Sequence, residues 1–392
     1  MSINALLAIR RQVTNRIAHY HNLAVLIGSP KQTSKSLCKK TSRQTANWCR
    51  SRDTWGVALV VHHLRGMTSA LPTPTPQLQY SIKLSSREIL PDTMSRVEKQ
   101  NQQIQEIVSS NDNDGVKIDQ IAKVRGWFRP EEGSYFFAVV QDYLKEKLKL
   151  EDAAKKILTP IDEKIAAERL DDVNFMDLWF SILHAARRTH YRDADIHISI
   201  VRLVAAFKEH SIPNNAQYNY LHNEQTDLLM ACREAYNDQP TPGSSFEVEN
   251  QAWSNLNFFL ALLVREKLAD NFVFAIWAMR QALETPHQDD EDSTAVQKYE
   301  TYVPAAAVWV FGAHHALFEK QEDLTPKDKK HGNPGRGGEL WKGKAEFSHA
   351  RWNFWKDRFA EIATMDGLSE DTKVVAKDAV ESMERAATFE KM

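Results

Sequence analysis

Cysteine is scarce in this sequence of 392 residues, which contains only Cys38, Cys49 and Cys232. The three form no C-x-x-C pair, and their odd number leaves one unpaired. This pattern argues against a disulfide framework and for a reducing compartment. We therefore expect an intracellular protein, cytoplasmic or nuclear.

Long hydrophobic runs and strand signals are also missing. The longest candidate run, Leu256–Val264, is stopped by Arg265-Glu266-Lys267. A membrane-spanning helix needs about 20 consecutive apolar residues, so we expect no membrane span. Alternating β-branched runs bounded by turn residues hardly occur after Ser86. Their scarcity favours an all-α fold.

Catalytic and metal-binding signatures are absent as well. The sequence contains neither G-x-S-x-G nor H-E-x-x-H, and Cys232 lies within a helical pattern, where cysteine usually acts as a small hydrophobic residue. His190, Asp193 and His197 have i, i+3, i+7 spacing, but Tyr191–Asp193 has the character of a joint between two helices. We predict that these histidines make hydrogen bonds, and we predict no metal and no cofactor.

The charge of the chain is divided unevenly. Residues 1–87 carry 13 Lys/Arg against the single acid Asp53, whereas the remainder carries 37 bases and 51 acids. We interpret residues 1–93 as a disordered basic segment, because Ser, Thr, Lys and Pro dominate parts of it. Its first 30 residues are amphipathic, Arg-rich and free of acids, as in a mitochondrial targeting peptide. The alternatives are a solvated tail or a spurious extension before Met94.

Nucleic acid is not an expected partner of this basic segment, since no aromatic interleaving or binding motif accompanies its charges. Residues 94–133 are interpreted as a linker with a leading helix, and residues 134–388 as a helical domain. Pro160 is predicted to interrupt a helix. The QPTPGSS stretch near 237–248 is predicted to end another helix and to subdivide the domain.

Two apolar runs, Leu256–Glu284 and Val303–Glu319, dominate the second half of the chain. A helix that is apolar on most sides is packed on all sides by other elements. We therefore predict two long central helices joined by the acidic linker Asp289–Asp292. Trp352, Trp355 and other tryptophans lie on apolar faces and are interpreted as core residues.

Three phrases carry a resemblance to a known family: FAIWAMRQALE, VPAAAVWVFGAHHALFE and GGELWKGKAEFSHARWNFWKDRF. Together they resemble a fungal family of uncharacterised proteins, domain-of-unknown-function family 3632, over about residues 134–388. The resemblance implies an all-α fold. It implies no activity, cofactor or catalytic residue.

A basic, glycine-rich stretch near residue 338 could bind an anion. Gly338–Ala345 fits the phosphate-loop pattern G-x-x-x-x-G-K, but Ala345 lacks the hydroxyl group that would bind Mg²⁺. We expect a surface loop that Trp341 anchors to the core. In an otherwise acidic domain, its cations could still hold an anion or an acidic partner. The candidate residues are Lys329, Lys330, Arg336, Lys342 and Lys344.

The catalytic candidates are His315, Glu319 and His314. His315 and Glu319 form an i, i+4 pair on a predicted core helix, so we expect a buried and satisfied polar pair. If the protein has a general base, this pair is the first choice, because burial shifts pKa values.

The sequence thus predicts an all-α multi-helix bundle or irregular helix-pair stack, preceded by a disordered basic segment. Such stacks most often serve as binding surfaces. A non-enzymatic interaction or scaffold protein with a protein partner is therefore the leading hypothesis. The first alternative is a small-molecule-binding or enzymatic helical domain that uses the His315–Glu319 pair. The second alternative is a mitochondrial protein with a cleaved presequence.

Overall fold

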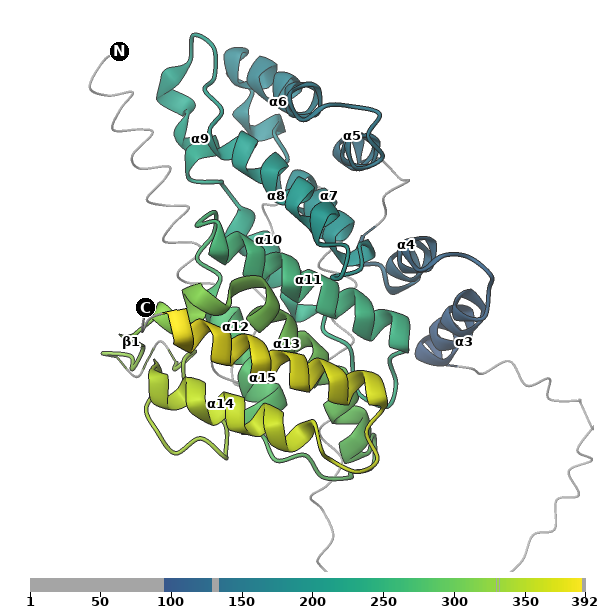
Figure 1. Cartoon of the computed structure of the whole chain (residues 1–392). Coiled ribbons are helices and arrows are strands. Elements are labelled where there is room, and N and C mark those ends of the chain that lie inside the picture. Colours follow the sequence, from purple (N-terminus) through teal and green to yellow (C-terminus); the bar gives the residue numbers. More distant parts are fainter. Residues whose placement is uncertain (1–94, 129–133, 329, 331, 390–392) are drawn as a thin grey trace, which may run out of the picture. The chain divides into compact units, whose positions relative to one another are not determined.

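The computed structural model describes residues 95–128, 134–328, 330 and 332–389. The helices of the first part are α3 (Arg96–Val108), α4 (Asp114–Arg125), α5 (Tyr135–Leu144), α6 (Leu150–Ala166), η1 (Leu170–Asp172), α7 (Phe175–Arg188), α8 (Ala194–Lys208), η2 (Ala216–Tyr218), α9 (Tyr220–Asn223) and α10 (Leu228–Asn237). They are followed by α11 (Glu247–Arg265), α12 (Phe272–Met279), the π-helical turn η3 (Arg280–Glu284), α13 (Ala295–Glu319), α14 (His349–Ile362) and α15 (Glu370–Phe389). Two short antiparallel strands, β1 (Glu322–Asp323) and β2 (Glu346–Phe347), complete the described part (Figure 1).

Helices α11 and α13 form the centre of the fold. Every residue of α11 from Ala252 to Val264 is buried, and α13 packs most extensively against α11 and α15 (Figure 1). Trp309 of α13 is fully buried, and its Nε1 donates a hydrogen bond of 2.8 Å to Oδ1 of Asn257 in α11. The prediction of central helices at these two places is confirmed.

A glycine permits the close approach of these two helices. A Cβ atom placed on Gly312 would lie 2.7 Å from Cβ of Ala261 in α11 and 3.3 Å from the carbonyl oxygen of Phe258. Real Cβ atoms do not approach each other so closely, so the helix contact depends on the missing side chain. The next residue, Ala313, has a non-helical φ of −146°, which kinks α13.

The predicted continuous run Leu256–Glu284 is wrong in one respect. The chain leaves the helical path after Arg265 and resumes it only at Phe272, so α11, α12 and η3 take the place of one long helix. Lys267 adopts the left-handed conformation, with φ of 56°, and ends α11 in the way that glycine usually does. The second predicted helix, Val303–Glu319, starts too late in the sequence. Helix α13 begins at Ala295 and includes Pro304.

Pro160 does not interrupt its helix, contrary to the sequence prediction. Helix α6 continues through it to Ala166. Proline has no N–H for the carbonyl group four residues earlier, which belongs to Lys156. The hydroxyl group of Tyr135 donates to that carbonyl oxygen at 3.2 Å instead.

The C-terminal helices follow the sequence pattern closely. The Ser348 hydroxyl caps α14 by accepting from the Arg351 backbone N–H at 3.2 Å. The segment of predicted helix-stopping residues, Gln239–Ser245, lies between α10 and α11. The tryptophans of α14, Trp352 and Trp355, are buried as predicted.

The all-α fold class is confirmed, since the described residues are helical apart from β1, β2 and connecting segments. Residues Thr93–Met392 form one unit by their contacts. Within the described ranges, no helix is long and apolar enough to cross a membrane. The targeting and disorder predictions concern the basic segment 1–93, which lies outside the described residues.

Candidate functional site

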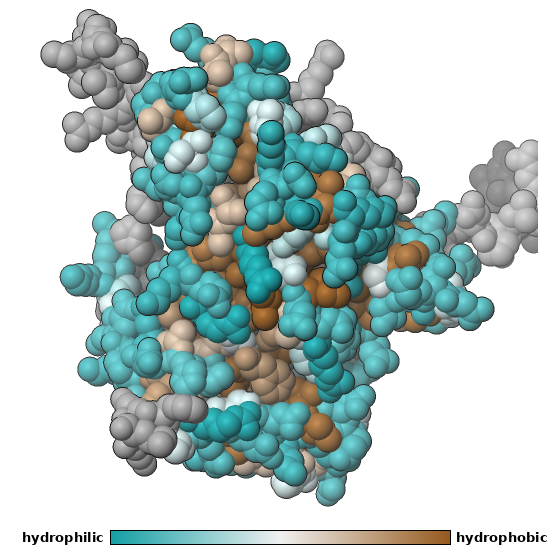
Figure 2. Space-filling view, turned by 45° about the horizontal axis from the view of Figure 1, so that its top comes forward, coloured by the Kyte–Doolittle hydropathy of each residue, from teal (hydrophilic) through white to brown (hydrophobic). Residues whose placement is uncertain are grey.

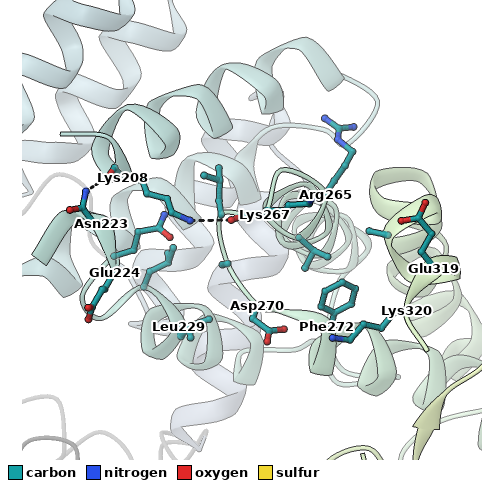
Figure 3. Close-up of a pocket in the computed structure, with 16 residues that line it drawn as sticks. Lys208, Asn223, Glu224, Leu229, Arg265, Lys267, Asp270, Phe272, Glu319 and Lys320 are labelled. Atoms are coloured by element: carbon teal, nitrogen blue, oxygen red, sulfur yellow. Dashed lines mark hydrogen bonds between the residues drawn. The ribbon is translucent and has the colours of Figure 1, made fainter. Parts of the chain in front are cut away.

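A groove of about 600 Å³ lies between four segments: the end of α8, the α9–α10 region, the α11–α12 connection and the end of α13. Figure 3 shows its lining from these segments, which are far apart in the sequence. The apolar part of the lining consists of Leu228, Leu229, Val264, Leu268, Ala269, Phe272 and Ala316. The polar part consists of Lys208, Asn223, Glu224, Gln225, Arg265, Lys267, Asp270, Glu319 and Lys320.

The groove exists because α11 and α12 are separate helices. At the break, the Leu268 N–H donates to the Leu263 carbonyl oxygen at 2.8 Å, and Leu268 is buried beneath the groove. Three non-glycine residues near it, Gln225, Asp227 and Lys267, have positive φ values of 50°, 67° and 56°. Left-handed conformations of such residues cost about 1 kcal/mol or more each, and they tend to cluster at functional sites.

The cations of the groove are mostly engaged with neighbouring groups. The Lys208 ammonium donates to the Lys267 carbonyl oxygen at 3.0 Å, as the dashed line in Figure 3 shows. Arg265 pairs with the adjacent Glu266 at 2.7 Å. Lys320 pairs with a β1 carboxylate at 2.6 Å and lies 4.6 Å from the centre of the Phe272 ring.

The carboxylates of the groove are not engaged in this way. Within the described ranges, Glu224, Asp270 and Glu319 have neither an ion pair nor a side-chain hydrogen bond, and all three are exposed. The only cation of the lining that is similarly unengaged is Lys267. Lys208 donates only to a neutral carbonyl oxygen and keeps its charge, so the groove offers a ligand three carboxylates against the charges of Lys208 and Lys267, a small excess of negative charge.

Hydrophobic side chains remain accessible at the edge of the groove. On α10, Leu229 is 53% exposed and Met230 is 38% exposed. Figure 2 shows one face of the molecule, on which hydrophobic surface reaches solvent between hydrophilic side chains. Single exposed apolar residues are ordinary, but here the exposed Leu229 adjoins an apolar lining of several residues.

A second and more polar pocket of about 630 Å³ lies beside the π-helical turn η3. Its lining includes Tyr236, Trp277, Arg280, His287, Lys298 and Tyr302. Two of its cations already have partners: Arg280 donates to the Arg336 carbonyl oxygen at 3.1 Å, and Lys298 pairs with Asp290 at 2.5 Å. This pocket therefore offers an anion less free positive charge than its composition indicates.

A fully buried ion pair lies next to that pocket. Arg351 donates from Nε to Oε1 of Glu284 at 2.7 Å and from Nη2 to Oε2 at 3.0 Å. Both side chains are 0% exposed, and Trp355 Nε1 adds a hydrogen bond of 2.6 Å to the same carboxylate. The pair joins η3 to α14.

The phosphate-loop-like stretch belongs to this ion-pair network. The Gly338 N–H donates to Oε2 of Glu284 at 2.7 Å, and a Cβ atom on Gly338 would lie 2.5 Å from the Glu284 backbone oxygen. The glycine thus serves loop packing against η3. Trp341 is half-buried, packs on Gly337 and Gly343, and has its ring centre 5.5 Å from that of Phe354, so it holds the loop against α14. Glu284 adds a second link between the loop and the core.

The predicted anion-binding cations are dispersed around this loop. Lys330, Arg336, Lys342 and Lys344 are exposed, and Lys329 lies outside the described residues. Lys342 donates to the Glu339 carbonyl oxygen at 2.6 Å, and Lys344 lies 3.8 Å from an Asp323 oxygen. Anion binding by this loop stays a prediction.

The expectation of a buried pair formed by His315 and Glu319 is wrong, because both side chains are exposed. Helix α13 is well buried only up to the kink at Ala313, and beyond it only Leu317 and Phe318 are buried. His314 is half-buried, and burial lowers the pKa of its imidazole. Glu319 lies at the edge of the groove and not in a closed core.

His190 and His197 make hydrogen bonds as predicted, and His184 of α7 makes one as well. The Arg192 N–H donates to His190 Nδ1 at 3.1 Å. His184 Nε2 lies 2.7 Å from the Asp119 carboxylate of α4, and His197 Nε2 lies 3.0 Å from the Thr189 carbonyl oxygen. Burial lowers the pKa of His197 to about 4, so this ring is neutral at physiological pH. Burial also raises the pKa of the Cys232 thiol to about 12, which makes this cysteine unreactive.

One cluster was missed by the sequence analysis. Asp162, His210 and His222 place one potential ligand atom each within 4.8 Å of one another. They come from α6, the segment after α8, and α9. The two intervals in the sequence are long and match no local ligand motif, so only the folded chain brings these residues together.

The described residues thus form an all-α domain with a surface groove. The family model described as "Protein of unknown function (DUF3632)" matches residues 179–359. This match confirms the family resemblance over that range, which is narrower than the predicted 134–388. It spans the whole groove, from Lys208 to Lys320. Neither the curated proteins nor the solved structures include a match to the chain.

Proposed function

We propose that the protein is a non-enzymatic interaction protein whose groove binds a basic amphipathic segment of a partner protein. The observation that supports this most is the combination of an apolar lining with three unengaged carboxylates, Glu224, Asp270 and Glu319. An amphipathic helix commonly binds by placing its apolar face in such a groove. Basic residues at the edge of that face would complement the carboxylates.

The distribution of engaged charges argues for a basic rather than an acidic segment. An acidic segment would have to compete with existing partners for Lys208, Arg265 and Lys320. It would also bring like charges next to the unengaged carboxylates, which disfavours binding. A basic segment meets free carboxylates without breaking any of these pairs.

The test uses the full chain and a fluorescently labelled Leu/Lys amphipathic peptide of about four helical turns. Fluorescence anisotropy should show binding of this peptide and weak or no binding of a Leu/Glu peptide with the same apolar pattern. Asp270→Lys and Glu319→Lys should each weaken binding about fivefold, which corresponds to roughly 1 kcal/mol. Leu229→Asp should weaken it further, because it places a charge against the apolar face of the peptide.

Glu381→Lys is the matched control, since it reverses an exposed charge on α15, outside the groove. Binding should be nearly unchanged in this variant. Equal binding of the Leu/Lys and Leu/Glu peptides would contradict the proposal. So would equal weakening by Glu381→Lys and Glu319→Lys, because it would indicate nonspecific attraction to an acidic protein.

A small-molecule function is the second candidate, and its support comes from the pocket beside η3. π-Helical turns occur frequently at functional sites, and aromatic and cationic groups line this pocket. The version of this hypothesis that used a buried His315–Glu319 pair loses its basis with the exposure of both residues. A ligand that co-purifies and is lost from Trp277→Ala, but not from Leu229→Asp, would favour this second function.

A further inference from the structure

Two buried polar atoms without hydrogen-bond partners face each other between α6 and α9. They are Oδ1 of Asp162 and Nε2 of His222, 3.7 Å apart. That distance exceeds a hydrogen bond, and the His222 side chain is only 2% exposed. Buried polar atoms nearly always have a partner, so such a facing pair calls for an explanation.

A third polar group completes the cluster. His210 Nε2 lies 2.8 Å from the other Asp162 oxygen, Oδ2, and its ring centre lies 5.0 Å from that of His222. The segment between the two histidines is held in place by the Ile212 N–H, which donates to Asn219 Oδ1 at 2.8 Å. This contact folds the segment back on itself and so brings His222 next to His210.

We propose that Asp162, His210 and His222 form a binding site for a divalent transition-metal ion, with Zn²⁺ as the preferred ion. Imidazole nitrogens and a carboxylate oxygen are typical zinc ligands. In a tetrahedral zinc site neighbouring ligand atoms are about 3.4 Å apart. His210 Nε2 lies 2.8 Å from Oδ2 of Asp162, His222 Nε2 lies 3.7 Å from Oδ1, and one ligand atom from each residue lies within 4.8 Å of the others, so small side-chain rotations would bring three of them to this spacing.

An ion at this position would explain what a hydrogen bond alone leaves unexplained. The Asp162–His210 contact engages Oδ2 and His210, whereas Oδ1 and His222 Nε2 remain without a partner. Asp162 and His210 keep side-chain exposures of 16% and 23%, so water can reach the site. Water would occupy the fourth coordination position, as in zinc sites that have three protein ligands.

The experiment uses the full chain after metal removal with EDTA and buffer exchange. Titration with Co²⁺, followed by visible absorption, should show one ion per chain with the intense bands of a tetrahedral site. Zn²⁺ should then displace it. His222→Gln and Asp162→Asn should each weaken Co²⁺ binding at least about a hundredfold. Loss of a residue that only hydrogen-bonds to a metal ligand already costs up to about a hundredfold in affinity, and loss of the ligand itself costs more.

His315→Gln is the control, because the exposed His315 and its neighbour His314, with ring centres 4.2 Å apart, are the alternative place for adventitious binding. Uptake that is lost in this variant and kept in His222→Gln would overturn the proposal. Absence of stoichiometric Co²⁺ uptake would overturn it as well. If His222→Gln fails to fold by circular dichroism, Asp162→Asn decides, since it keeps the side-chain shape.

Discussion

At the scale of single residues, Glu284 is a fully buried carboxylate with a hydrogen-bond partner on each oxygen. Its carboxylate accepts from Arg351, Trp355 and the Gly338 N–H, and its backbone oxygen accepts from the Leu340 N–H at 2.8 Å. A carboxylate with 0% exposure is tolerated only with such complete pairing. The acid thus joins η3, α14 and the loop before β2.

Arg351→Leu should lower the free energy of unfolding by about 3–5 kcal/mol, because it leaves a buried carboxylate without its cation. Urea unfolding near neutral pH measures this change. Lys356→Met is the control, since it removes an ion pair of 3.8 Å to Glu384 on the surface. That exposed pair contributes no more than about 1 kcal/mol. Equal losses in the two variants would refute the central role of the buried pair.

His197 makes stability depend on pH. Its folded-state pKa is about 4, because burial disfavours the charged ring, whereas the ordinary value is 6.5. Between these values the unfolded state binds a proton that the folded state does not, so stability falls as the pH falls from about 6.5 to about 4. The loss attributable to His197 should reach about 2 kcal/mol at about pH 5.

His197→Phe removes this titration while filling the space beside Phe258 with another ring. Urea unfolding of both proteins at about pH 7 and about pH 5 gives the two losses, and the variant should lose less than the wild type. Absolute stability is not the readout, because the substitution also removes the hydrogen bond to Thr189. Identical losses in both proteins would show that other groups carry the pH dependence.

At the scale of elements, the contact between α11 and α13 depends on Gly312. Gly312→Ala should destabilise the protein by about 1–3 kcal/mol, because its Cβ would overlap that of Ala261, 2.7 Å away. Adding Ala261→Gly should recover part of the loss, since it makes room for the new methyl group. Thermal or urea unfolding of the single and double variants measures the coupling. Strict additivity would mean that the loss in Gly312→Ala does not arise from contact with Ala261.

Elements were easier to predict than the breaks between them. The apolar composition of α11 and α13 indicated burial on all sides, and the apolar faces that carry Trp352 and Trp355 indicated core positions. The break at Lys267 was missed because the segment has no Pro or Gly, and the left-handed conformation there is set by packing. The kink at Ala313 directly follows Gly312, a possible signal that the sequence analysis did not use, and it is near this kink that α13 stops being well buried.

The site was less predictable for the same reason. The groove results from the missed break, and the Asp162–His210–His222 cluster joins residues whose positions are related only through the fold. A helical pattern can place His315 and Glu319 on one face, as the sequence analysis did. It cannot state whether another helix covers that face, and here none buries it.

At the scale of the whole molecule, zinc should stabilise the folded chain. An ion that binds the native state and not the unfolded one adds about 2.7 kcal/mol at a free concentration of a hundred times its Kd. Differential scanning fluorimetry should therefore show a higher Tm with Zn²⁺ than with EDTA, and no such difference in Asp162→Asn. Hydrogen exchange should slow most between His210 and His222, where the ion closes a loop of the chain.

The buried ion pair also has a consequence for the order of events during synthesis. Glu284 and Arg351 are 67 residues apart, and chain elongation proceeds at about 5–20 residues per second. For roughly 3 to 13 seconds the nascent chain therefore holds a carboxylate whose cation has not yet been made. Until then Glu284 must stay hydrated, so the turn that contains it, and the packing of α12 beside it, wait for the C-terminal helices. The later-made segment that carries Arg351 is thus the part that allows the turn around Glu284 to become buried.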